Sequence, residues 1–214
     1  MVTNTGIWKV VEANTTPAFK KIFRDEKNYL DSHVRKNSKV LEVGCGDGRI
    51  LNDIIHLTKN LTGIDHDIKA VEAAKTNFKN VPEVKIILVE AKEMPFKDNE
   101  FDTLTCMLNL ANFGANKVKI LKEMRRVLKP NGKIVMSVYS EDAFQERMKL
   151  YKKVKIGIKE IHGTTVLLDF EGNLEDHTSE QFSKNQLMEL FNKTNLKVLD
   201  IKKSGIIYLF TLGK

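Results

Sequence analysis

Short apolar runs with β-strand character alternate with helical patterns through the middle of this 214-residue chain. The strand-like runs cover residues 39–43, 61–64, 84–89, 101–108 and 133–139. Helical patterns lie between them at about 48–57, 68–78 and 115–128, and the last one stops at the breaker segment 129–132, Lys-Pro-Asn-Gly. Alternation of this kind predicts a parallel sheet covered by helices on both faces.

Both ends of the chain add elements to this core. Thr16 and Pro17 mark a helix start, since proline is tolerated in the first turn, and apolar spacing carries the helix to about Val34. Ser183 and Gln186 form a capping-box pattern that opens a helix over 184–193. Residues 196–202 and 206–212 then make two strands whose short connection forces antiparallel pairing. The predicted fold class is α/β: a doubly wound, mostly parallel seven-stranded sheet with an antiparallel C-terminal hairpin.

Composition limits the class of protein. With 42% hydrophobic and 29% charged residues, the chain matches an ordinary globular domain, and no window reaches the roughly 20 consecutive apolar residues of a membrane-spanning helix. The N-terminus lacks the charged start and apolar run of a secretory signal. Cys45, Cys106, His162 and His177 have no metal-ligand spacing, and two cysteines make no disulfide framework. We therefore expect no metal, no membrane partner and a cytoplasmic location.

A net charge of +7 is compatible with a polyanionic binding partner. Residues 115–129 and 145–161 carry much of the excess positive charge. Lysine-rich helix faces are common on protein surfaces, which favours a simple solvated surface. Neither segment interleaves aromatic residues for base stacking, but nucleic-acid binding remains an alternative.

The most informative stretch joins an apolar strand to a helix through three glycines on alternate positions. It reads Val-Leu-Glu-Val-Gly-Cys-Gly-Asp-Gly-Arg over residues 40–49. Glycine has no Cβ, so the turn can be tight and a ligand can lie against the backbone. The free N–H groups at the following helix start would favour a carboxylate. A glycine turn that serves only packing is the alternative.

The spacing of the residues around this turn limits the kinds of ligand that could bind there. A dinucleotide fingerprint reads G-x-G-x-x-G, whereas here Gly44, Gly46 and Gly48 alternate. Asp65 ends the next strand, about 20 residues on, where an acid can accept hydrogen bonds from ribose hydroxyls. Asp65 could instead cap the helix that follows, although Asp67 is better placed for that. The turn and the acid together indicate a nucleoside with a compact group attached.

At this point the chain resembles the class I S-adenosylmethionine (SAM)-dependent methyltransferases. Residues 40–48 resemble their first motif, E-x-G-x-G-x-G, Asp65 matches the acid of the second, and residues 89–102 resemble the third, with Glu90 where Asp is usual. Residues 121–138 also follow the family pattern, and the resemblance covers about 38–140 and the C-terminal hairpin. It implies that SAM is the cofactor and that these residues bind it: Glu42, Gly44, Cys45, Gly46, Asp65, His66, Glu90, Ala91 and Asn109.

Methyl transfer from a sulfonium is a direct displacement, so alignment alone can supply much of the catalysis. A base is needed only if the acceptor carries a proton that must leave. The missing catalytic dyad is therefore compatible with an enzyme, and no catalytic residue is predicted. The segment 106–113 has no N-P-P-Y motif for base methylation and no Pro-Cys nucleophile, and Cys106 is expected in the core.

Candidate contacts to the acceptor come from the sheet edge and from the N-terminus. Asn109 and Asn112 follow the fourth strand, and Tyr139 ends the fifth, at the carboxyl edge where open α/β sheets bind ligands. Trp8 and Tyr29 precede the core, where related enzymes often place a lid. Loop capping for the asparagines and plain packing for Trp8 and Tyr29 are the alternatives.

We expect one methyltransferase domain with four parts. These are a helical lid over 1–37, a cofactor-binding core over 38–140, an inserted acceptor region over 141–182, and a final helix and strands over 183–214. A hairpin of strands 153–161 and 164–170, joined around His162 and Gly163, is predicted in the insertion. The favoured function is methyl transfer to a small molecule. An RNA or protein acceptor bound through the basic surface, or a SAM-binding subunit without catalysis, remains open, and the oligomeric state is not predicted.

Overall fold

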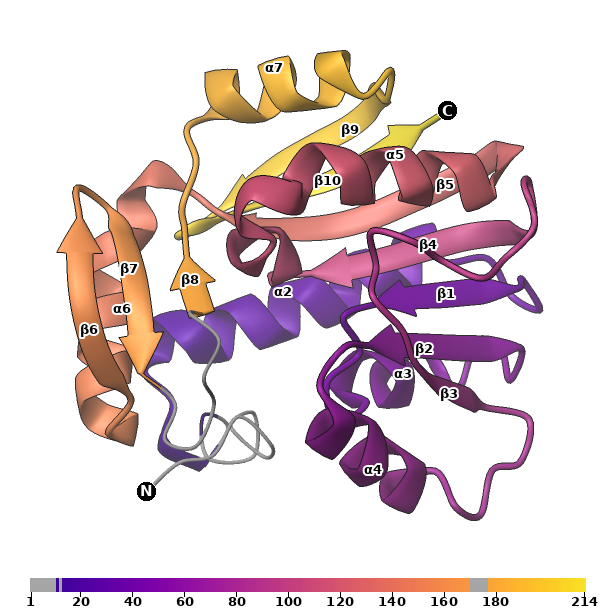
Figure 1. The fold of residues 1–214 in the computed structure, drawn as a ribbon, viewed down its shortest axis with the longest axis horizontal. Helices are drawn as coiled ribbons and strands as arrows, with labels where there is room; N and C mark the ends of the chain where they lie inside the picture. Colours follow the sequence, from indigo (N-terminus) through magenta and orange to yellow (C-terminus); the bar gives the residue numbers. More distant parts are fainter. Residues whose placement is uncertain (1–10, 12, 170–176) are drawn as a thin grey trace.

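A computed structural model describes residue 11 and the ranges 13–169 and 177–214 (Figure 1). The elements are α2 (Pro17–His33), β1 (Val40–Val43), α3 (Arg49–Ile54), β2 (Leu61–Asp65), α4 (Ile68–Asn77), β3 (Lys85–Leu88), β4 (Phe101–Met107), η1 (Asn109–Asn112), η2 (Gly114–Asn116), α5 (Lys117–Val127), β5 (Leu128–Tyr139), η3 (Glu141–Ala143), α6 (Phe144–Val154), β6 (Gly157–His162), β7 (Thr165–Asp169), β8 (His177–Ser179), α7 (Lys184–Lys193), β9 (Lys197–Ser204) and β10 (Ile207–Gly213). No helix in these ranges is long and apolar enough to cross a membrane.

Seven strands form one sheet in the order β3-β2-β1-β4-β5-β10-β9. The first five run parallel to one another, with Val40 of β1 opposite Leu61 and Thr103 of its two neighbours. β10 is antiparallel to both β5 and β9. The predicted fold class is confirmed.

Helices cover both faces of this sheet, as Figure 1 shows, and each face has its own apolar cluster. One cluster joins α2, α3 and α6 to the sheet, and the other joins α5 and α7 to the opposite face. Strand alternation separates them: Val40 and Val135 belong to the first cluster, and Leu41 and Ile134 to the second. Burial on both faces leaves the strand ends as the place where polar groups can gather.

The N-terminal helix α2 is part of the core. Thr16 caps it by accepting a hydrogen bond from the Phe19 N–H at 3.4 Å, and Pro17 occupies its first turn. Phe19 and Leu30 are fully buried against the sheet. A lid formed by residues 1–37 therefore does not describe α2, and residues 1–10 lie outside the described ranges.

The breaker segment 129–132 lies within strand β5, and not between the helix and the strand as the sequence predicted. Helix α5 ends at Val127, and β5 starts at Leu128, whose backbone is already extended. The pairing with β4 shifts register between Phe101 and Thr103, which accommodates the proline and glycine inside the strand. The predicted end of the helix is confirmed, whereas the strand starts at Leu128 and not at Lys133, because a register irregularity accommodates the breaker residues within it.

The insertion after β5 contains a helix that the sequence reading missed. Helix α6 occupies 144–154, where the predicted strand 153–161 was to begin, and Lys155 ends it in the left-handed conformation. β6, β7 and β8 then form a separate antiparallel three-stranded sheet (Figure 1). The hairpin around Gly163 is present, with β7 described as far as Asp169, and residues 170–176 lie outside the described ranges. The lysines of α6 interrupt the apolar pattern in its sequence, although its buried face includes Leu150 and Tyr151.

Candidate functional site

The glycine turn follows β1 at the carboxyl edge of the sheet. Gly44, Gly46 and Gly48 have φ of +76°, +55° and +94°, values that favour glycine. A Cβ at Gly44 would lie 2.7 Å from the Asn109 Nδ2, and one at Gly48 would lie 2.4 Å from the Phe78 ring. The last glycine thus serves packing against the end of α4, while the first brings the turn against Asn109. Helix α3 is six residues long, shorter than predicted.

Asp65 ends β2 with its side chain turned toward the glycine turn. One oxygen accepts a hydrogen bond from the Gly46 N–H at 2.8 Å, and the other accepts from the Asp67 N–H at 3.0 Å. Asp67 caps α4 by accepting from the Lys69 N–H at 2.8 Å, so the capping role falls to Asp67. Because a carboxylate has about four acceptor sites, Asp65 keeps capacity for further donors. His66 is exposed, with Nδ1 3.5 Å from Asp65.

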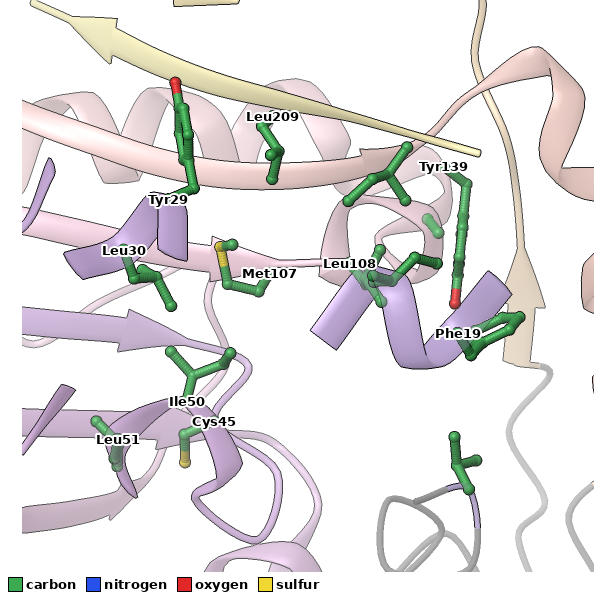
Figure 2. Close-up of a cluster of buried hydrophobic side chains, with 14 of the residues drawn as sticks. Phe19, Tyr29, Leu30, Cys45, Ile50, Leu51, Met107, Leu108, Tyr139 and Leu209 are labelled. Carbon is green, nitrogen blue, oxygen red and sulfur yellow. The ribbon is translucent and has the colours of Figure 1, made fainter. Parts of the chain in front are cut away.

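Asn109 reaches the turn from the end of β4. Leu108 has φ of +62°, unusual for a bulky residue, and its N–H donates to the Ser137 hydroxyl at 2.9 Å. This bend lets the Asn109 amide donate to the backbone oxygens of Gly44 at 2.7 Å and Val43 at 3.1 Å. Figure 2 shows Met107 and Leu108 at this strand end. The structure therefore brings Asn109 onto the glycine turn.

Glu42 lies buried in β1, 1% exposed. Thr105 donates a hydrogen bond to its Oε2, while Oε1 has no hydrogen-bond partner among the described residues. Burial raises the pKa of Glu42 well above its usual range, although Arg49 opposes the shift. An acid with a spare buried oxygen thus lies two residues before Gly44.

Three further polar residues near Glu42 were missed in the sequence: Glu26, Arg49 and Ser137. Glu26 on α2 is fully buried, accepts a hydrogen bond from the Ser137 hydroxyl at 2.5 Å and lies 3.0 Å from the Arg49 guanidinium. Burial raises the pKa of Glu26, and Arg49 opposes that shift. Since Ser137 also accepts from Leu108, a hydrogen-bond chain runs from α2 to the bend that positions Asn109. The available signal was Glu26 itself, an acid at a core position of the α2 apolar pattern.

Other predicted cofactor residues lie around the same edge. Val89 follows β3, and its N–H donates to the Asp65 carbonyl at 2.8 Å, which brings the next residues close to the end of β2. Glu90 is exposed, 3.7 Å from Lys92, and Ala91 is half-buried. Their contact with a cofactor stays a prediction.

Both cysteines are buried and free. Cys45 is 6% exposed inside the glycine turn, and Cys106 is fully buried in β4. Burial raises the pKa of both thiols well above the usual range, so neither is activated as a nucleophile.

The predicted acceptor residues do not form one group. Tyr139 lies at the end of β5, with its ring 6.2 Å from the Phe19 ring between centroids (Figure 2). Asn112 is exposed at the end of η1. Tyr29 instead packs between α2 and β10, where its hydroxyl donates to Asp200 at 2.7 Å, so the structure gives it a packing role. Trp8 lies outside the described residues.

The basic helix α5 has most of its charge paired. Four of its cations, or those directly after it, contact acidic side chains: Lys117 with Glu180, Lys119 with Glu93, Arg126 with Glu123 and Asp98, and Lys129 with Asp102. Such pairing reduces the positive field available to a polyanion. Within the described ranges, no three His, Cys, Asp or Glu side chains form a group that could hold a metal ion.

Comparison with known proteins agrees with this geometry. The family described as a methyltransferase domain matches residues 34–195. Demethylmenaquinone methyltransferase of Staphylococcus aureus is 36% identical over 129 residues, which cover 58% of this chain and 53% of that protein. The chain thus spans about half the length of the curated relatives it matches.

Solved structures share the fold at lower identity. A protein from Pyrococcus horikoshii has a TM-score of 0.74 at 21% identity, covering 94% of this chain and 93% of its own. The 1,6-didemethyltoxoflavin-N1-methyltransferase of Burkholderia thailandensis, with S-adenosylhomocysteine bound, has a TM-score of 0.64 at 16% identity, covering 90% and 77%.

The seven-stranded sheet with its antiparallel C-terminal strands has the class I methyltransferase architecture, and the glycine turn lies at the carboxyl edge of that sheet. The chain belongs to the methyltransferase-domain family. SAM is the cofactor of this class, in agreement with the sequence prediction.

Proposed function

We propose that this protein transfers a methyl group from SAM to a small-molecule acceptor by direct displacement. The proposal depends on the hydrogen bonds that link the glycine turn to neighbouring strands. The Asp65 carboxylate accepts from the Gly46 N–H at 2.8 Å, and the Asn109 amide donates to the Gly44 carbonyl at 2.7 Å. The sulfonium of the bound cofactor supplies an electrophilic methyl group. The protein's own part is to hold and orient the two reactants.

Specific residues fit the cofactor. The spare acceptor sites of Asp65 suit two ribose hydroxyls, and the unpaired Glu42 Oε1 suits a cationic amino group. The backbone at Gly44 and Gly46, free of side chains, allows close approach of the ligand. His66, Glu90 and Ala91 lie beside this edge, where they would line the adenine.

Two observations support a small acceptor. The charge on α5 is largely paired within the protein, which reduces the positive charge that this helix offers to RNA. The Staphylococcus aureus relative is named for a small substrate, demethylmenaquinone, and the Burkholderia thailandensis neighbour for another. Residues 141–182 are the proposed acceptor region, because they lie directly after Tyr139 at the same edge.

The test uses SAM with an isotopically labelled methyl group. The protein is incubated with cell extract separated by ultrafiltration into small molecules and macromolecules, and calorimetry measures binding of SAM, S-adenosylhomocysteine and NAD. We expect binding of the first two and label in the small-molecule fraction. Label in RNA or protein would favour the alternative acceptors, and SAM binding without any transfer would indicate a non-catalytic subunit.

A further inference from the structure

Arg147 on α6 carries a fully buried positive charge, 0% exposed. Its Nη2 donates to the Ser179 carbonyl at 2.6 Å, Nη1 to the Gln181 side-chain oxygen at 3.1 Å, and Nε to the Tyr151 hydroxyl at 3.4 Å. All three acceptors are neutral. A buried charge is costly unless an opposite charge accompanies it.

The acidic side chains around α6 do not supply that opposite charge. Three of them pair with lysines instead: Glu141 with Lys203 at 3.1 Å, Glu146 with Lys149 at 2.7 Å, and Glu180 with Lys117 at 2.5 Å. Across the described part of the chain, no carboxylate forms an ion pair with Arg147. Within the described residues, only neutral acceptors therefore hold the Arg147 guanidinium.

The guanidinium acts on the site through Tyr139. Its Cζ lies 5.0 Å from the centroid of the Tyr139 ring, at the carboxyl end of β5. No group in the described ranges lies within hydrogen-bonding distance of the Tyr139 hydroxyl. Burial raises the pKa of Tyr139, and Arg147 offsets only part of that shift, so the phenol keeps its proton and can donate it in a hydrogen bond.

The charged groups at the two ends of the site differ. The Asp65 carboxylate lies at the glycine turn, beside Glu42 and the Glu26–Arg49 ion pair, while Arg147 stands behind the phenol donor at the other end. Complementarity of charge favours a cationic donor molecule at the first end and an anionic acceptor at the second.

Resting on the proposed function, we propose that Tyr139 and Arg147 select methyl acceptors that carry a negatively charged oxygen. Tyr139 donates a hydrogen bond to that oxygen. Arg147 is a positioning residue, because it holds and polarises Tyr139 without touching the acceptor. Carboxylates, phenolates and enolates share this chemistry.

The first experiment sorts acceptors by charge. The small-molecule extract is passed over an anion exchanger at about pH 5, which retains carboxylates, and then at about pH 10, which also retains phenolates and enolates. Each fraction is assayed with labelled SAM. Transfer to either retained fraction supports the inference, and the two fractions distinguish the sources of the charge. Transfer only to the unretained fraction overturns it and leaves the proposed function intact, whereas SAM binding without transfer to any fraction removes both.

The second experiment uses variants with the retained acceptor. Tyr139→Phe should raise the KM for the acceptor about tenfold or more while the dissociation constant for SAM stays unchanged. Arg147→Gln should act in the same direction, and Arg147→Lys should restore part of the loss because it keeps the charge. Tyr208→Phe is the matched control, since its hydroxyl bonds Glu141 on another surface. An unchanged KM in Tyr139→Phe overturns the inference, and that variant decides the matter if the Arg147 variants do not fold.

Discussion

The glycine-turn end and the α6 end of the site are built differently. Around the glycine turn, neighbouring strands of one sheet supply the polar groups, and backbone geometry at Gly44 and Gly46 sets their positions. At the other end, the Arg147 side chain on α6 donates to the backbone carbonyl of Ser179 in the small sheet and to the Gln181 side chain. The difference teaches that main-chain conformation fixes the glycine turn, which is the proposed cofactor site, whereas the α6 end, the proposed acceptor site, depends on which side chains α6 and the small sheet carry.

The largest expected effect tests the cofactor end. Asp65→Ala should weaken SAM binding by about 100-fold or more, because charge-assisted hydrogen bonds contribute ~1.5–3 kcal/mol each and the Gly46 anchor is also lost. Calorimetry measures the dissociation constant, and Asp67→Asn, which retains a capping oxygen on α4, is the control. Unchanged affinity in Asp65→Ala would remove the ribose assignment.

A pair of glycine substitutions compares the two regions directly. Gly44 and Gly163 both have positive φ, +76° and +61°, so alanine costs about 1–2 kcal/mol of folding stability at either position. At Gly44 the new Cβ also collides with Asn109, whereas at Gly163 it meets nothing within 4 Å. We expect SAM affinity to fall about tenfold in Gly44→Ala alone. Equal affinities in the two variants, compared by calorimetry and thermal unfolding, would show that Asn109 does not shape the proposed cofactor site.

The buried acid of the cofactor end predicts a pH dependence of stability. Because burial raises the folded-state pKa of Glu42 above the ordinary 4.5, the folded form holds its proton more tightly than the unfolded form. The stability from this group is fully present below about pH 4.5 and is lost as the pH rises through the folded pKa. Glu42→Gln should therefore flatten the decline and weaken SAM binding.

Glu100 provides a control of opposite sign. Its hydrogen bond from Lys39 lowers the pKa, so its contribution is present above the ordinary value and is lost as the pH falls. Denaturant unfolding from about pH 2 to 9 measures both curves. A Glu42→Gln curve parallel to the wild-type curve would contradict the assigned pKa direction.

The smallest effect on methyl transfer is expected from substitutions on the basic surface of α5. Lys119→Gln and Lys122→Gln remove exposed positive charges of α5. For a small acceptor, transfer should not change in these variants, nor vary steeply between about 50 and 200 mM salt. A steep loss with salt, reduced in the variants, would instead favour RNA.

Much of the fold could be predicted because its signals are local. Strand alternation, the capping box at Ser183 and the turn at Gly44 each depend on residues close in sequence, and the structure shows the corresponding sheet, helix and positive φ values. Helix α6 was missed because its three lysines and the buried Arg147 interrupt the apolar pattern that marks a buried helix face. The start of β5 was predicted too late, at Lys133, because pairing with a strand distant in sequence outweighs the local breaker at Pro130.

By itself, the sequence determined how strands and helices follow one another along the chain, and it located the glycine turn and the acid one strand later. These signals are local, because hydrophobic periodicity and the absence of a Cβ act over a few residues. Only the tertiary structure decided which side chains meet. Ser137 and Glu26 are 111 positions apart, and Asn109 and Gly44 are 65 apart, yet each pair is hydrogen-bonded. Arg147 likewise reaches Tyr139 through the packing of α6. Such contacts follow from how whole elements pack, which no short window of sequence specifies.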